Sequence, residues 1–463
     1  MIERFECKGT WYIPENPENT VDGILTFDPD GESILDLIGS FTEFYSKVQN
    51  QKIILGFTNK GHKITLLECM EINRSESFPG IKTTSFLVTF IFEGAHFQNV
   101  DEIKFSSINA SLAKLEEWVD IWGLSSEHII ESNGIKAICN FIDPIPFKIS
   151  NSLSGKFNFY FNSPILPIPE FTIKQITKIE MISDYDMDFH IMLEHLFHFN
   201  LFLTLGIFED TFIKEIELTS NALTFLTKEN IPYKEKVKLF FNQSKRNLKV
   251  LSRSHHYFLF KYTHIRTNFE TVIQKFFKLK ETIPPVIDVI FSTFSAKDEY
   301  TENRFLNIIQ ALELYHRKIY ENTDALKIDF ESKLDPILFK LSDQQKKWLN
   351  EKLIYKYEPN LRTRLKFLFR KFPINPLNKI VPNKEDLFKL INATVNSRNY
   401  YTHYDEELKD KAYKDDKLFY LTEKLRFLLI IIVLSETGFT NSEIDKFFSK
   451  NEHIFYRYLV NNQ

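Results

Sequence analysis

The chain has 463 residues, which is too long for one ordinary core and predicts two to four domains. Hydrophobic residues make up 43% and charged residues 26%, with 46 Phe against 13 Gly, so the composition excludes a disordered or low-complexity chain. A formal net charge of -4 excludes a surface that is basic throughout, so a polyanion would have to bind a local patch.

The cysteine pattern and the start of the chain predict a cytoplasmic protein. Cys7, Cys69 and Cys139 lie far apart without CxxC spacing, which argues against a disulfide framework and against a zinc site. The start MIERFECKGTWY lacks the basic and apolar parts of a secretory signal. The most apolar run, FLLIIIVL at 427–434, is far shorter than the roughly 20 residues that span a bilayer, so it predicts a buried helix and no membrane segment.

The first 180 residues predict strands. Short apolar runs rich in β-branched and aromatic residues occur at 22–27, 52–57, 63–70 and 83–92, and Asn59, Lys60 and Gly61 supply turn chemistry between two of them. In KFNFYF at 156–161, Phe157, Phe159 and Phe161 alternate and would line one face of a strand.

Two helices and two more strands complete this region. Apolar residues at helical spacing predict a helix at 110–122, and a second helix is expected at 186–205. FIKEIEL and EKVKLFF then return to strand patterns. We therefore expect residues 1–265 to form one β-rich domain with helical insertions.

After residue 265 the pattern becomes helical. Asn383 is expected to cap a helix that opens with acidic residues, and Gly438 to follow the end of another. The fold class predicted for the whole chain is therefore α+β, with an all-α bundle at 266–463. The expected helical segments are 268–284, 302–320, 342–354, 361–372, 383–401 and 417–438.

The stretch SRNYYTHY at 397–404 is a candidate active site. Arg398 falls on or beside the apolar stripe of its helix, where a charge needs a partner. Residues five apart on a helix differ by about 140°, so Arg398 and His403 would not point at one spot unless His403 lies at the helix end or the pocket forms between helices. A helix C-terminus raises the pKa of a histidine and a nearby arginine lowers it, a balance that suits a general acid or base near neutral pH.

An arginine and a histidine without a carboxylate cluster suit RNA cleavage that needs no metal. A base removes the 2′-hydroxyl proton, a guanidinium neutralises the phosphorane, and a 2′,3′-cyclic phosphate is left. Spacing alone is a weak signal, because R-x4-H pairs arise by chance in a chain with 58 Lys and Arg and 12 His.

The segment resembles the R-x4-to-6-H motif of the HEPN ribonucleases, in which a polar residue, here Asn399, follows the arginine. The helices at 303–319 and 421–439 resemble those of the Apea-type HEPN proteins of abortive-infection antiphage systems. GTWYIP, DGILTFDPDG, IILGFTNKGHKITLLEC and LAKLEEW are similar to the N-terminal domain of the same family. The resemblance spans nearly the whole chain and is looser from 125 to 265.

The resemblance implies a homodimer whose two R-x4-H motifs face each other in a composite site without a cofactor. Arg398 would bind the scissile phosphate, His403 would act as general base or acid, and Asn399 would orient one of them. Glu313 matches an acidic residue of the family that would hold Arg398, although a purely stabilising ion pair accounts for it equally well. His316 and Arg317 could extend the pocket, but a helix-surface pair is favoured.

A basic stretch is the best candidate for contact with the RNA backbone, although the polar side of an amphipathic helix explains it equally well. It comprises Arg362, Arg364, Lys366, Arg370 and Lys371. His195 and His198 have metal-ligand spacing but no third ligand nearby, so packed histidines are favoured, as they are for His255 and His256.

The resulting hypothesis is an endoribonuclease that cuts host RNA, such as tRNA, when an unknown phage trigger releases it from an N-terminal sensing domain. One alternative is a non-catalytic HEPN module that dimerises and binds RNA or nucleotide. Another is an interaction protein whose stretch at 361–371 docks an acidic partner. Tyr400, Tyr401 and Tyr404 would either stack on a base or bury the site.

Overall fold

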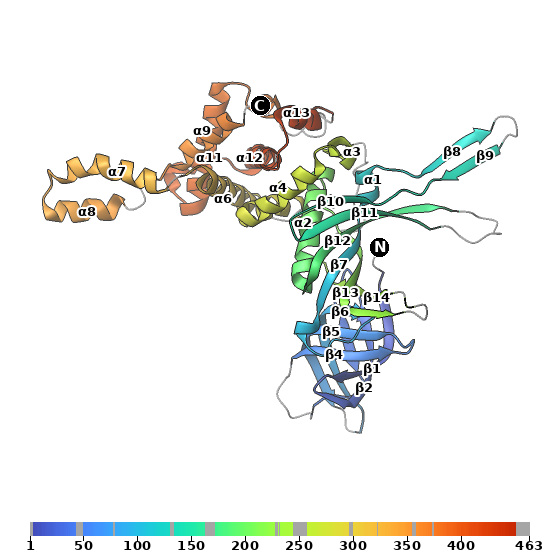
Figure 1. Cartoon of the computed structure of the whole chain (residues 1–463). Helices are drawn as coiled ribbons and strands as arrows, with labels where there is room; N and C mark the ends of the chain where they lie inside the picture. The colour runs from blue at the N-terminus through green and yellow to red at the C-terminus, as the bar shows by residue number, and fades with distance from the viewer. Residues whose placement is uncertain are drawn as a thin grey trace. The chain divides into compact units, whose positions relative to one another are not determined.

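The structure is a computed structural model, and it divides into two units, residues 1–270 and 271–463 (Figure 1). Each unit is described by itself. The structure describes residues 3–42, 50–76, 79–129, 134–162, 172–226, 230, 232–243, 257–295, 300–321, 323–353, 358–372 and 375–450.

The first six strands of unit 1 form a closed antiparallel barrel. Hydrogen-bonded neighbours run β6-β3-β2-β1-β4-β5, and β5 pairs back with β6, so no strand of the barrel has a free edge. Trp11, Leu25, Phe27 and Leu66 are among the side chains that fill the interior. The strands are β1 (Phe5–Ile13), β2 (Asn16–Phe27), β3 (Ile34–Leu37), β4 (Gln51–Thr58), β5 (Lys63–Glu76) and β6 (Lys82–Glu93).

A second, open sheet shares strand β6 with the barrel. Its order is β10-β11-β12-β7-β13-β14, and β14 pairs with the second half of β6 from Lys238 opposite Glu93 to Phe241 opposite Phe90. A separate hairpin joins β8 to β9. The strands are β7 (Lys104–Leu112), β8 (Leu124–Ile129), β9 (Gly134–Cys139), β10 (Ile145–Lys148), β11 (Leu153–Asn162), β12 (Lys174–Asp188), β13 (Ile213–Leu226) and β14 (Pro232–Phe241).

Helix α2 (Phe189–Ile207) packs against β7 and β12 on one face of the open sheet. Its N-cap Asp188 accepts a hydrogen bond from the His190 amide at 2.9 Å. Most of its residues are buried, as the apolar composition predicts for a helix surrounded by protein. The strands expected in this unit, including the alternating KFNFYF, and the helix expected at 186–205 are confirmed.

The helix expected at 110–122 is mostly wrong. Strand β7 continues to Leu112 because it pairs with both β12 and β13, and α1 covers only Leu115–Val119. Lys114 and Asp120 adopt left-handed conformations on either side of α1, which limits it to little more than one turn. A short helix, α3 (Tyr262–Ile265), follows later in the unit.

Unit 2 is helical, and the six helical segments expected after residue 265 are confirmed. Helices α6 and α12 are central, since each packs against α5, α11 and the other, and the run at 427–434 is fully buried in α12. The helices are α4 (Phe269–Thr282), which contains the boundary between the units, α5 (Pro284–Ser295), α6 (Thr301–Tyr320), α7 (Thr323–Leu338), α8 (Asp343–Leu353), α9 (Leu361–Lys371), α10 (Asn375–Ile380), α11 (Lys384–His403), α12 (Asp415–Glu436) and α13 (Asn441–Ser449).

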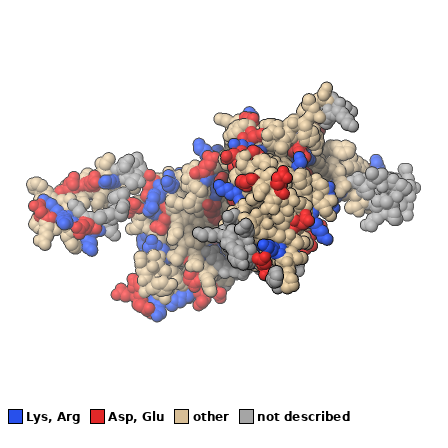
Figure 2. Space-filling model, turned by 90° about the horizontal axis from the view of Figure 1, so that it is seen from below, with Lys and Arg blue, Asp and Glu red and all other residues tan. Residues whose placement is uncertain are grey.

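Helices α7 and α8 extend away from the other helices of unit 2 (Figure 1). On the face of the molecule in Figure 2, acidic and basic side chains are intermixed and do not form one broad basic field. Within the residues that the structure describes, none of the helices has the length and apolarity needed to cross a membrane.

Candidate functional site

Helix α11 carries the motif at its C-terminal end. Asn383 caps the start of the helix, as expected, by accepting a hydrogen bond from the Asp386 amide at 2.9 Å. Leu390, Ile391 and Ser397 lie on the buried face. The helix ends where Tyr404 takes the left-handed conformation with φ 51°. His403 is therefore the last helical residue.

The segment after α11 folds back and holds the end of the helix. The Tyr413 amide donates a hydrogen bond to Ser397 Oγ at 2.8 Å, and the Tyr401 hydroxyl donates one to the Tyr413 carbonyl at 2.9 Å. Burial raises the pKa of Tyr401 to about 12, so the phenol remains protonated and keeps donating at neutral pH. These contacts were missed in the sequence because no local pattern joins residues 397 and 413.

The two central residues of the motif are differently exposed. Arg398 is half-buried, and the one hydrogen bond it makes with a described residue runs from Nη1 to Asn399 Oδ1 at 3.1 Å. His403 is exposed. Because both lie within one helix, they point about 140° apart. A single chain therefore offers the guanidinium and the imidazole in different directions.

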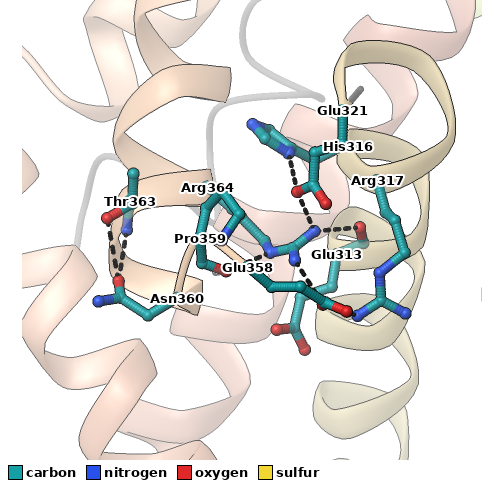
Figure 3. A network of polar contacts seen from close by, with 9 residues as sticks. All are labelled: Glu313, His316, Arg317, Glu321, Glu358, Pro359, Asn360, Thr363 and Arg364. Atoms are coloured by element: carbon teal, nitrogen blue, oxygen red, sulfur yellow. Dashed lines mark hydrogen bonds and ion pairs between the residues drawn. The ribbon is translucent and has the colours of Figure 1, made fainter. Parts of the chain in front are cut away.

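Glu313 does not hold Arg398 as the resemblance implied. Within the described part of the chain no hydrogen bond or ion pair joins their side chains, and the Glu313 carbonyl instead accepts a 3.4 Å hydrogen bond from Arg364 Nη1. The Glu313 carboxylate points away from that carbonyl in Figure 3. Asn399 is the residue that contacts Arg398 in this structure.

Arg364, expected to contact RNA, is instead buried in a polar network (Figure 3). Arg364 is only 2% exposed. Its guanidinium binds Glu321 Oε1 at 2.5 Å, Glu358 Oε2 at 3.3 Å and the Pro359 carbonyl at 2.8 Å. A guanidinium with these partners is structural, so Arg364 is withdrawn from the candidate RNA contacts. The amphipathic pattern of α9 did not reveal this, because position 364 lies beside its apolar stripe.

His316 and Arg317 belong to the same network. His316 is 6% exposed, which corrects the expectation of a surface pair, and its Nδ1 lies 2.9 Å from Glu321 Oε1. Burial lowers the pKa of His316, so the imidazole is neutral at pH 7 and donates its Nδ1 proton to the carboxylate. Arg317 donates to Glu358 Oε2 at 2.9 Å.

The other cations of the basic stretch divide into one inward and three outward residues. Arg362 Nη1 donates a hydrogen bond to Asn392 Oδ1 and so joins α9 to α11. Arg370 and Lys371 are exposed and Lys366 is half-buried. The Lys371 ammonium lies 5.8 Å from the centre of the Tyr320 ring.

The tyrosines in the spacer and the one that follows His403 differ in their surroundings. Tyr401 is committed to the fold, whereas the Tyr400 ring lies under Lys414 Nζ at 5.7 Å and Tyr404 is 72% exposed. Tyr404, which directly follows His403, is thus the tyrosine of this stretch whose ring is most open to a ligand.

The histidines of α2 form no metal site in the part of the chain that the structure describes. The rings of His195 and His198 lie 6.4 Å apart, and the described residues contain no group of three His, Cys, Asp or Glu side chains that would hold a metal ion. His255 and His256 lie outside the described residues.

Two family models match the chain. The ApeA N-terminal domain 1 matches residues 6–276, and the Apea-like HEPN domain matches residues 306–443, which include the whole of α9 and α11. No curated protein and no solved structure matches it.

Proposed function

Since the chain belongs to the ApeA-type HEPN family, and HEPN domains are generally ribonucleases, we propose that it is an endoribonuclease with Arg398 and His403 as its catalytic residues. The observation that carries this proposal is the position of the motif. An exposed histidine lies at the end of a helix inside the HEPN match, together with a half-buried arginine whose one hydrogen bond to a described residue is to its neighbour Asn399. Both side chains could therefore engage a substrate.

The proposed chemistry is transfer of the phosphoryl group to the neighbouring 2′-oxygen. His403 removes the 2′-hydroxyl proton, the 2′-oxygen bonds to phosphorus, and the bond from phosphorus to the 5′-oxygen breaks. Arg398 neutralises the charge on the phosphorane, and the departing 5′-oxygen takes up a proton. The products are a 2′,3′-cyclic phosphate and a 5′-hydroxyl. Asn399 positions Arg398 through the hydrogen bond described above.

The divergence of the two side chains supports a composite site in a homodimer. One helix directs Arg398 and His403 about 140° apart, so a phosphate that touches both is more readily held between two copies of α11. In a two-fold dimer the arginine of one protomer would face the histidine of its partner. Two equivalent sites would result.

The proposed biological role is antiphage defence in the cytoplasm. Cutting host RNA, for which tRNA is the first substrate to test, would stop translation and so phage growth. The barrel and open sheet of unit 1 would receive the phage trigger and control the nuclease.

The test is cleavage of 3′-end-labelled tRNA and total RNA by the purified chain in EDTA. We expect cutting that leaves cyclic phosphate ends and that Arg398→Ala and His403→Ala each abolish, whereas Thr402→Ala, at the exposed residue beside His403, keeps it. Growth arrest on expression, with and without phage, is measured in parallel for an enzyme that needs its trigger. Cutting or arrest that survives both substitutions would overturn the proposal.

A further inference from the structure

The outward face of α9 forms a surface pocket of about 490 Å³. Its lining is Thr363, Lys366, Phe367, Arg370 and Lys371. These positions recur every three or four residues, so they share one side of the helix, while Leu365 and Leu368 face the core. One short helix therefore presents three cations and an aromatic ring together.

The charge of this pocket is positive and unbalanced. None of its lining residues is acidic, and Lys366 and Arg370 form no ion pair with a described residue. Although the net charge of the whole chain is -4, the local positive charge of this pocket favours the binding of an anion. Phosphate groups are suitable anions because lysine and arginine both bind them, arginine in a bidentate manner.

The ring of Phe367 is exposed and held in place. The residue is 38% exposed, and its ring centre lies 4.9 Å from that of His316 and 4.8 Å from that of Tyr320. His316 is fixed in turn by Glu321, which also binds Arg364 (Figure 3). The buried network thus supports the aromatic group from behind, so its open surface is preorganised for a flat ligand.

We propose that this pocket binds an unpaired nucleotide of the RNA, with the base stacked on Phe367 and the flanking phosphates held by Lys366, Arg370 and Lys371. Single-stranded nucleic acids are bound by this combination of a cationic groove with an aromatic platform. A base inside a duplex has no free face for Phe367. The inference rests on the proposed function and narrows its substrate to RNA with an unpaired region.

The pocket is linked to the motif helix within unit 2. Arg362, on the same helix α9, hydrogen-bonds to Asn392 of α11, and α9 packs against α11. RNA held on α9 is therefore bound by an element in direct contact with the helix that ends in His403. The α9 pocket would select the substrate and the motif would cut it.

The experiment is equilibrium binding of fluorescein-labelled oligoadenylate by fluorescence anisotropy, in EDTA and with His403→Ala in every protein so that the probe stays intact. A duplex of the same length and an oligonucleotide with abasic positions serve as competitors. We expect Phe367→Leu to weaken binding of the single strand by about 5- to 150-fold and Phe367→Tyr to retain it. The duplex and the abasic strand should compete poorly.

The charge variants separate phosphate contacts from stacking. Lys366→Gln, Arg370→Gln and Lys371→Gln should each reduce the slope of log binding constant against log salt by about 0.7, whereas Phe367→Leu should leave the slope unchanged. Thr363→Val, at the one neutral polar position of the pocket, is the matched control for packing. Hydrogen exchange of α9 shows whether each variant retains the helix.

Two results would overturn the inference. Binding that the charge variants weaken but Phe367→Leu leaves intact would mean a backbone or acidic-peptide site without a base. Binding that none of the variants changes would place the RNA elsewhere. Failure of the proposed nuclease function gives a different result from failure of this inference. In that case RNA is not cleaved, while single-stranded RNA still binds at α9.

Discussion

Two arginines of the helical unit show opposite uses of the same side chain. Arg364 is 2% exposed, and its guanidinium binds two carboxylates and two carbonyl oxygens. Arg398 is half-buried and bonds to one described side chain, that of Asn399. A guanidinium has five N–H donors, so Arg364 is nearly saturated by the fold while Arg398 has donors left for a ligand.

The positions of these arginines explain the difference. Glu321 follows α6 and Glu358 precedes α9, so Arg364 ties together the chain that enters the α7 and α8 pair and the chain that leaves it. Arg398 lies in the last two turns of α11, where the side chain can reach beyond the core. We infer that Arg364 stabilises the unit and that Arg398 acts on a substrate.

The largest expected effect is on catalysis at the motif. His403→Ala should lower the cleavage rate by about 10²- to 10⁴-fold, the usual contribution of a general acid or base, and Arg398→Ala by about 10²- to 10³-fold. The midpoint of urea unfolding should stay unchanged because His403 is exposed. Single-turnover cleavage of labelled RNA measures the first quantity. If the loss of activity only matched a loss of folded protein, Arg398 and His403 would have a structural role, and Arg398 would no longer differ from Arg364.

Arg364→Met should have the opposite pattern, a loss of stability. It should destabilise unit 2 by about 3–5 kcal/mol, because it leaves the Glu321 side chain, which is 3% exposed, without its cation. Hydrogen exchange of α6 and α9 in increasing urea gives the local stability. Arg370→Met, at an exposed arginine of the same helix, should change it by less than about 0.5 kcal/mol.

A double variant sharpens the assignment to charge. Arg364→Met with Glu321→Gln removes both members of the buried pair, so it should recover part of the stability that Arg364→Met loses. If the double variant is less stable than the single one, packing rather than an unpaired charge explains the cost.

A complementation experiment, in which the cleavage rate should be about a quarter of the native rate, tests whether Arg398 acts together with the His403 of a partner chain. Mixing Arg398→Ala with His403→Ala chains under conditions of subunit exchange should restore about a quarter of the native rate, because half of the dimers are mixed and each has one intact site of two. Cleavage of labelled RNA after mixing measures it. Mixtures that stay inactive would mean that both groups of a site come from one chain.

The sequence predicted the secondary structure better than the roles of side chains. The runs of apolar residues defined β2, β4 and α12 because burial on one or all faces imposes a period on the sequence. The helix at 110–122 failed since the pairing of β7 with two distant strands overrode a local helical pattern. Long-range pairing leaves no mark in a window of ten residues.

The candidate site shows the same limit. The place of Arg398 and His403 at the end of a capped helix could be derived from spacing and from Asn383. That Arg364 binds Glu321 and Glu358 could not, since 43 and six residues of sequence separate the partners and many carboxylates are available to an arginine. Glu313 was placed near Arg398 on the resemblance alone, and its carbonyl rather than its carboxylate has the observed contact.

The smallest expected effect is a dependence of stability on pH that originates in the Arg364 network. Burial lowers the pKa of His316 from its ordinary value of 6.5, and the charge of Arg364 acts in the same direction, while Glu321 opposes them. Below pH 6.5 the unfolded chain therefore binds a proton that the folded chain does not. Stability due to His316 is full above that pH and is lost as the pH falls toward the folded pKa, by at most about 1.4 kcal/mol per unit.

The measurement is the urea midpoint of α6 and α9 by hydrogen exchange at pH 7.5 and pH 5.5. His316→Asn, whose amide can still donate to Glu321, should show a smaller loss on acidification than the native chain, because it has no imidazole to protonate. His403→Asn, at the exposed histidine of the motif, should follow the native chain. An equal loss in the native chain and in His316→Asn would show that other groups set the acid sensitivity. The network would then owe its stability to Arg364 and its carboxylate partners, without a contribution from the protonation state of His316.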